Sequence, residues 1–197
     1  MSFITKLKNF YHLTRYGINI LSSSLRNSTS YENDAYNFIN NSNLSSKTKY
    51  LIWVDTSNFK TNIFKGSINN WTLIDSYICT IGKPSAPTIK GIFYAGPKGY
   101  SFGEARGFRC LYYTQIKDNY LFHSIPYNLD GSIRDPRLGM QLTDGCVRLS
   151  TKNAKWIYDN VSSGTTVRIG DNLDYPLTNP TRYTWTGGAF GSDPTYR

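Results

Sequence analysis

Charge, cysteine and long apolar runs are all scarce in this sequence. Charged residues make up 18% of the 197 residues and aromatic residues 15%, whereas a disordered chain carries more charge and fewer rings. No apolar run approaches the roughly 18 residues of a membrane span, and none near the N-terminus has the roughly 7–15 apolar residues of a signal-peptide core. We therefore expect a folded protein of one domain, or one domain with an arm, whose exported form is trimmed or leaves the cytoplasm by another route.

Acidic residues are too few to balance the basic ones. The chain has 22 Lys and Arg residues against 13 Asp and Glu, a formal net charge of +9. An anionic partner is therefore expected, such as nucleic acid, a membrane surface or a charged cell-wall polymer. The basic residues do not gather in one stripe, and the sequence has no RNA-recognition or zinc-finger pattern. Nucleic acid is thus the partner that we do not expect.

Only three cysteines are present, Cys79, Cys110 and Cys146. Because the number is odd, at least one thiol is free or pairs with another molecule. Cys79 and Cys110 lie in strand-like runs, which predicts two small buried side chains; a disulfide between them stays open as the alternative. The sequence has no Cys-x-x-Cys or His-x-x-x-His spacing, so we expect no metal site and no cofactor.

Three regions differ in composition. Residues 1–48 form a basic arm and linker, whose first 31 residues hold four basic residues, no acid, and apolar residues near helical spacing. This predicts a helical arm that is either a solvated surface helix or a segment in contact with a membrane surface. Residues 49–170 form the folded domain, and residues 171–197, rich in Pro, Gly and Tyr, form a loop-like tail.

Short strand-like runs fill most of the domain. They are rich in β-branched and aromatic residues and are separated by turns such as Gly96-Pro97-Lys98-Gly99. The expected strands are Tyr50–Asp55, Thr61–Phe64, Trp71–Ile74, Tyr77–Ile81, Gly91–Tyr94, Cys110–Ile116, Tyr120–Phe122 and Thr165–Ile169. One persuasive helix covers residues 151–161, with Ser150 as its N-cap and Gly164 after its end. The predicted fold class is therefore mainly β with one short helix.

A histidine and a cysteine stand out as candidates for chemistry. His123 follows a strand-like run and precedes Cys146 by 23 positions, and Cys146 stands beside Gly145 at the end of a long loop. An imidazole can take the proton of a thiol, which at its usual pKa of roughly 8.5 is mostly protonated at neutral pH. Gly145 lets the backbone approach a substrate closely, and the amides near Cys146 are candidate donors to an oxyanion. A buried structural cysteine gives the same local pattern, so the pair alone does not distinguish a catalytic cysteine from a structural one.

The residues around this pair form an ordered series of motifs. Phe122-His123-Ser124 is followed by Thr143-Asp144-Gly145-Cys146-Val147-Arg148-Leu149-Ser150, and upstream lie Cys79-Thr80-Ile81-Gly82 and Pro87-Thr88-Ile89-Lys90-Gly91-Ile92-Phe93. In this order they resemble the catalytic domain of the L,D-transpeptidases, the YkuD-type enzymes of bacterial cell walls, over about residues 49–170. The resemblance implies a β-sandwich or barrel with a short helix after the nucleophile.

The resemblance also implies roles for single residues. Cys146 matches the nucleophile, with Gly145 beside it; His123 matches the general base. Ser124 matches the residue whose backbone carbonyl orients the imidazole. The residues assigned to substrate binding are Arg148, Asp144, Thr143 and Tyr113, of which Arg148 either supports the site or meets a substrate carboxylate.

Two further segments are candidates for the walls of a substrate groove. The Gly-rich stretch 96–109 carries Tyr100, Phe102 and Phe108, which either belong to the core or line a substrate loop. The loop between His123 and Cys146 is long and contains an Asp130-Gly131 turn, which predicts an extended flap over the groove.

One position departs from the family pattern. The usual residues before the nucleophile are Ser/Thr-His-Gly, and Asp144 stands where that histidine is expected. A carboxylate near the nucleophile opposes thiolate formation unless it faces away or is hydrogen-bonded. We predict that Asp144 accepts hydrogen bonds from loop amides and fixes the loop that carries Gly145 and Cys146.

The reaction that the resemblance implies is acyl transfer between peptidoglycan stem peptides. The thiolate attacks the carbonyl of the third stem residue, D-Ala leaves, and the acyl group passes to the side-chain amine of another stem, which gives a 3→3 cross-link. Transfer to water would make an L,D-carboxypeptidase, and loss of catalysis would leave a wall-binding module. The implied location is extracytoplasmic, at the wall or surface of a bacterium, with anionic wall polymers as further candidate partners. Carbapenems are expected to acylate the same thiol, and the oligomeric state is left open.

Overall fold

The computed structural model describes residues 31–171 of the chain. Residues 31–40 are helical. The chain divides into two compact units, Met1–Phe38 and Ile39–Arg197, and the sheets and the site described below lie in the second. The predictions of a basic helical arm before residue 31 and of a loop-like tail after residue 171 lie outside the described residues.

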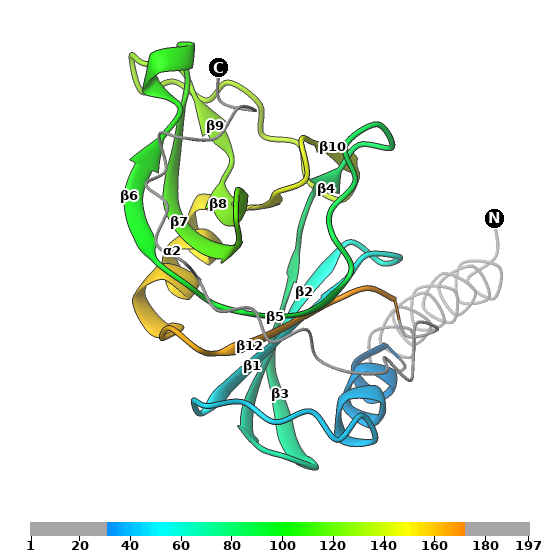
Figure 1. The fold of residues 1–197 in the computed structure, drawn as a ribbon. Coiled ribbons are helices and arrows are strands. Elements are labelled where there is room, and N and C mark those ends of the chain that lie inside the picture. Colours follow the sequence, from blue (N-terminus) through cyan, green and yellow to red (C-terminus); the bar gives the residue numbers. More distant parts are fainter. Residues whose placement is uncertain (1–30, 172–197) are drawn as a thin grey trace, which may run out of the picture. The chain divides into compact units, whose positions relative to one another are not determined.

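The second unit is mainly β, as the sequence predicted, and its first sheet has five strands (Figure 1). In spatial order these are β3 (Asn70–Ile78), β2 (Lys60–Ser67), β1 (Tyr50–Asp55), β12 (Thr166–Ile169) and β5 (Gly91–Tyr94). The first and last strands of the unit, β1 and β12, pair in parallel at the centre of this sheet. Every residue of β1 is buried, which explains why residues 50–54 are a continuous apolar run rather than an alternating one.

The second sheet carries the segment with the sequence motifs. It contains β11 (Val147–Leu149), β8 (Tyr120–Ser124), β7 (Arg109–Lys117) and β6 (Lys98–Phe102) in that order, and β9 (Pro126–Tyr127) pairs with β7. Strands β4 (Ile81–Gly82) and β10 (Gln141–Thr143) form a separate pair, and a single 3₁₀ turn, η1 (Glu104–Arg106), follows β6.

Helix α2 (Thr151–Asn160) directly follows β11 and packs on β7 and β8. Ser150 caps it, since the Ser150 hydroxyl accepts a hydrogen bond of 3.2 Å from the Asn153 N–H. Ala154 and Ile157 are buried on its inner face. The helix predicted after the candidate nucleophile is therefore confirmed.

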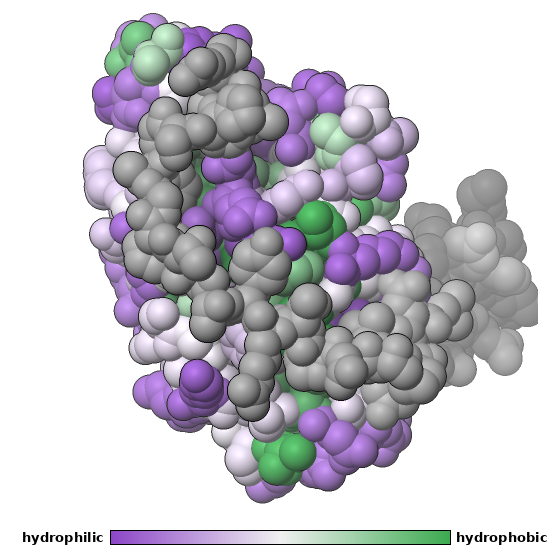
Figure 2. Space-filling view, in the orientation of Figure 1, coloured by the Kyte–Doolittle hydropathy of each residue, from purple (hydrophilic) through white to green (hydrophobic). Residues whose placement is uncertain are grey.

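One hydrophobic core joins the two sheets and the helix. Its buried residues come from both sheets and from α2, and include Ile52, Val167, Phe122, Leu149 and Ile157. In Figure 2, the visible apolar residues of the described part appear as patches among polar ones. No helix in the described range is both long and apolar enough to cross a membrane.

The stretch expected to be a loop around Gly96-Pro97-Lys98-Gly99 instead contains the start of β6. Glycine suits this strand because the Tyr113 ring lies over Gly99, where a Cβ atom would come within 2.2 Å of the ring. The expected strand Tyr77–Ile81 is also wrong as a unit, because Tyr77 and Ile78 end β3 whereas Ile81 begins β4.

Candidate active site

Strand pairing brings the candidate nucleophile and base together. Strands β8 and β11 lie side by side in parallel, with Arg148 opposite His123. Cys146 comes directly before β11, two residues ahead of Arg148. Because side chains alternate along a strand and paired residues face the same side of a sheet, Cys146, His123 and Arg148 share one face.

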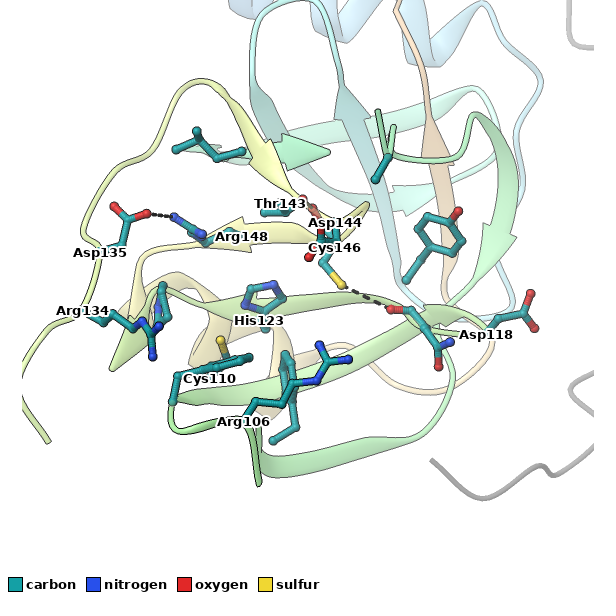
Figure 3. Close-up of a pocket in the computed structure, with 17 residues that line it drawn as sticks. Arg106, Cys110, Asp118, His123, Arg134, Asp135, Thr143, Asp144, Cys146 and Arg148 are labelled. Carbon is teal, nitrogen blue, oxygen red and sulfur yellow. Dashed lines mark hydrogen bonds and ion pairs between the residues drawn. The ribbon is translucent and has the colours of Figure 1, made fainter. Parts of the chain in front are cut away.

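These three side chains line a cavity of about 600 Å³ (Figure 3). Thr143 and Asp144 line it as well, as do Phe102, Phe108 and Cys110. Ser124, Gly145 and Tyr113 are predicted site residues that do not line the cavity. The sequence therefore found five of the lining residues from the motif alone.

The His123 ring is held from two sides. Its Nδ1 lies 2.6 Å from the Ser124 carbonyl oxygen, which can only accept, so Nδ1 carries the proton and Nε2 keeps the free lone pair. Phe102 lies edge-on against the imidazole, with ring centroids 5.3 Å apart. Burial lowers the pKa of His123 to about 4, and the positive charge of Arg148 acts in the same direction. The imidazole is thus neutral at pH 7 and able to accept a proton at Nε2.

The surroundings of Cys146 favour its protonated form. Its Sγ donates to the Asn119 carbonyl oxygen at 3.3 Å. Burial raises the pKa of the thiol to about 11, and the negative charge of Asp144 adds to the rise. Both shifts favour a neutral thiol and a neutral imidazole at pH 7, so ionisation of Cys146 before attack is unfavourable.

The loop before Cys146 is fixed by threonine hydroxyls and not by Asp144. The Thr143 hydroxyl accepts from the Gly145 N–H at 3.3 Å and donates to the Cys146 carbonyl oxygen at 2.6 Å. Asp144 instead lies 2.6 Å from Lys83 Nζ, and its side chain is 78% exposed. The expectation that Asp144 accepts from loop amides is wrong, because Thr143 already occupies that position and the carboxylate turns outward to a lysine.

Arg148 is paired within the protein. Its Nη1 lies 2.9 Å from Asp135 Oδ2 and also donates to the Arg137 carbonyl oxygen at 3.4 Å. Asp135 is shared, since the Arg137 guanidinium lies 2.8 Å from its Oδ1. Hydrogen bonds from Arg137 and then Arg148 hold the pKa of Asp135 well below its usual range. Arg148 thereby ties β11 to the loop between His123 and Cys146, which favours the supporting role of the two that the sequence left open.

Tyr113 packs against another aromatic side chain and does not line the cavity. Its ring lies against Phe102, with centroids 5.8 Å apart. The preceding residue, Tyr112, has a φ of 54°, and this left-handed backbone interrupts the alternation of β7. The assignment of Tyr113 to substrate binding stays a prediction.

The two other cysteines are free and buried. Burial raises the pKa of Cys79 and that of Cys110 to about 12 in each case, so both thiols are inert at neutral pH. Cys110 nevertheless lines the cavity beside His123. Within residues 31–171, no three His, Cys, Asp or Glu side chains gather as a set of metal ligands.

Comparison with known proteins gives the family. The family model of the L,D-transpeptidase catalytic domain, YkuD, matches residues 49–169. The chain belongs to the L,D-transpeptidase family. The matched range contains both sheets, α2 and every residue that lines the cavity.

Individual proteins resemble this L,D-transpeptidase domain in sequence or in fold. The L,D-transpeptidase-type protein YciB of Bacillus subtilis (strain 168) is 31% identical over 127 residues, which are 60% of this chain and 65% of that protein. A fused Zn-dependent amidase/peptidase/peptidoglycan-binding domain-containing protein from Clostridium acetobutylicum is 39% identical, with a TM-score of 0.62, over 73% of this chain and 62% of that one. An L,D-transpeptidase of Stackebrandtia nassauensis, 17% identical, shares the fold with a TM-score of 0.50 over 64% of this chain and 57% of its own. The chain thus spans less than two thirds of each relative.

Sequence reasoning missed three contacts of the L,D-transpeptidase site. Asn119 accepts the thiol hydrogen bond, Asp135 pairs with Arg148, and Phe102 packs on His123. Asp135 left a signal, because a buried arginine needs an acid and the loop between His123 and Cys146 contains few. Phe102 was a candidate for a substrate loop, but its contact with His123 and the bond to Asn119 depend on strand pairing that no local pattern encodes.

Proposed function

We propose that this chain is a cysteine-dependent L,D-transpeptidase that joins peptidoglycan stem peptides through a thioester on Cys146. The observation that carries the proposal is the shared cavity, in which a half-buried Cys146 and a His123 with a free Nε2 lone pair lie on one sheet face. Family membership supports the reaction class. The peptidoglycan-binding description of the Clostridium relative supports the substrate class.

Acylation begins when a stem peptide enters the cavity and the thiol hydrogen turns from Asn119 to His123. Nε2 takes the proton as Sγ bonds to the carbonyl carbon of the third stem residue. The tetrahedral intermediate then breaks its C–N bond, and the amine of D-Ala leaves with the proton from His123. Cys146 is left as a thioester and His123 is neutral again.

Deacylation repeats the sequence in reverse with another nucleophile. The side-chain amine of a second stem attacks the thioester and gives up a proton to Nε2, the C–S bond breaks, and the proton returns to Sγ. The product is a 3→3 cross-link; water in place of the amine gives a tripeptide. An extracytoplasmic location at the cell wall follows from this substrate.

Incubation with purified disaccharide-tetrapeptide, followed by mass spectrometry, tests the proposal. A cross-linked dimer with release of D-Ala is the expected product. Tripeptide alone would identify an L,D-carboxypeptidase, and an unchanged substrate would favour the wall-binding module. Cys146→Ala is the matched control, since it removes the thiol and leaves the surrounding loop bonds, which use backbone and threonine groups, in place.

A further inference from the structure

One threonine hydroxyl bridges two distant parts of the backbone behind the nucleophile. Thr88 lies in the segment between β4 and β5 and is 7% exposed. Its Oγ1 accepts from the Gly82 N–H at 2.8 Å and donates to the Gly145 carbonyl oxygen at 2.7 Å. Both backbone groups are buried, so each would lack a partner without this hydroxyl.

The bond to Gly145 determines how the next peptide group is oriented. In a trans peptide the C=O of one residue and the N–H of the next point in opposite directions. The Gly145 C=O is turned toward Thr88, which does not line the cavity, whereas Cys146 does. The Cys146 N–H therefore points away from Thr88. The Thr143 hydroxyl bonds to the Gly145 N–H and to the Cys146 C=O, and not to the Cys146 N–H.

We propose that Thr88 is a positioning residue that aims the Cys146 N–H at the oxyanion formed during acylation; this inference rests on the proposed function. When Sγ bonds to a substrate carbonyl carbon, the carbonyl π electrons move to its oxygen, and the N–H beside Sγ donates to that oxygen. The bond to the leaving amine then breaks and the C=O reforms. Thr88 touches no reacting atom. It acts by keeping the donor from rotating with the flexible Gly145, whose φ is +111°.

Two reagents that react with the same thiol separate this role from a general structural one. Acylation by a carbapenem passes through an oxyanion: Sγ bonds to the lactam carbonyl carbon, the lactam C–N bond breaks and its nitrogen takes a proton. Alkylation by iodoacetamide displaces iodide and forms no oxyanion. Both rates are measured at Cys146 by mass spectrometry at one pH. Thr88→Val has nearly the same shape but lacks the hydroxyl, Thr88→Ala leaves room for a water, and Thr88→Ser keeps the hydroxyl.

We expect Thr88→Val and Thr88→Ala to slow carbapenem acylation by about 10–100-fold, since removal of an oxyanion donor costs about 10²–10³ and misalignment somewhat less. Iodoacetamide alkylation should stay within about twofold of wild type, and Thr88→Ser should restore acylation to within about threefold. Thr166→Val is the matched control, because Thr166 is 1% exposed and its hydroxyl also donates to a backbone carbonyl, that of Ser45. It should lower the melting temperature and leave both rates unchanged.

Three results would overturn the inference: acylation near the wild-type rate in Thr88→Val and Thr88→Ala, equal slowing of both reactions, or a serine variant as slow as the valine variant. Failure of the proposed function is a separate outcome. In that case wild type itself is not acylated and does not convert the tetrapeptide, while iodoacetamide still labels Cys146.

Discussion

Phe102 lies edge-on against His123, with the ring centroids 5.3 Å apart and the ring planes at 87° to each other. The contact and the Ser124 carbonyl together restrict the imidazole to one orientation. Phe102→Ala should therefore lower kcat/KM by about 10–100-fold, because a small misplacement of a catalytic group costs about that much. Phe102→Leu, which refills part of the space, should lose less. A wild-type rate in Phe102→Ala would show that the Ser124 bond alone suffices.

Ser124 orients the His123 ring through its backbone carbonyl and not through its hydroxyl. The Ser124 hydroxyl accepts from the Leu111 N–H at 2.8 Å and donates to the Ile125 carbonyl oxygen at 2.6 Å. Ser124→Ala should thus lower the free energy of unfolding by about 1–3 kcal/mol, since the Leu111 N–H loses its acceptor. The turnover rate should stay within about threefold of wild type. A loss as deep as that of His123→Ala would instead place the hydroxyl in the chemistry.

Acid should destabilise the protein through His123. Its pKa is about 4 in the folded state, below the value of about 6.5 expected in the unfolded chain. The unfolded chain therefore binds a proton first as the pH falls, so the stability present above about pH 6.5 is lost toward pH 4. Between pH 7 and pH 4.5 we expect a loss of about 2–3 kcal/mol from this group.

Urea unfolding of wild type and His123→Gln at both pH values isolates that contribution, because the other titrating groups are the same in the two proteins. The difference in unfolding free energy between them should shrink at pH 4.5. A difference that does not change with pH would mean that His123 titrates normally in the folded protein.

Asp144→Asn should ease ionisation of the nucleophile. Removal of the carboxylate charge lowers the pKa of the Cys146 thiol, because Asp144 is one cause of its rise, so iodoacetamide alkylation should reach half its maximal rate at lower pH. The exposed ion pair with Lys83 contributes at most about 1 kcal/mol, and turnover should change by less than about tenfold. Asp130→Asn, an exposed carboxylate in the same long loop that lies outside the cavity, is the control that should leave the profile in place. If the pH dependence of alkylation is unchanged in Asp144→Asn, Asp144 does not raise the pKa of Cys146.

The parts of the fold that the sequence predicted are those with strong local signals. Strands β1 and β5 and helix α2 follow from apolar runs and from the Ser150 cap. Strand β11 has only three residues, and β6 begins within a Gly-Pro-Lys-Gly turn pattern. Both exist because neighbouring strands pair with them, and pairing between distant segments leaves no short-range signal.

In the site, too, local signals could be predicted from the sequence and contacts between distant segments could not. Cys146 and His123 could be identified because the motif order is specific and each residue type has a defined chemistry. The outward turn of Asp144 could not be predicted, because it depends on Lys83, which lies far away in the sequence. The neutral state of His123 and Cys146 could not be predicted either, since it arises from burial of both groups in the folded protein.

The central claim is that Cys146 forms a covalent acyl-enzyme in this cavity. Intact-mass measurement after incubation with a carbapenem tests it most directly, because ring opening adds the whole ligand mass to the protein without loss of any atom. We predict one adduct per chain in wild type, located on Cys146 by peptide mapping, and none in Cys146→Ala. No adduct after long incubation with several carbapenems, or an equal adduct in Cys146→Ala, would contradict the account.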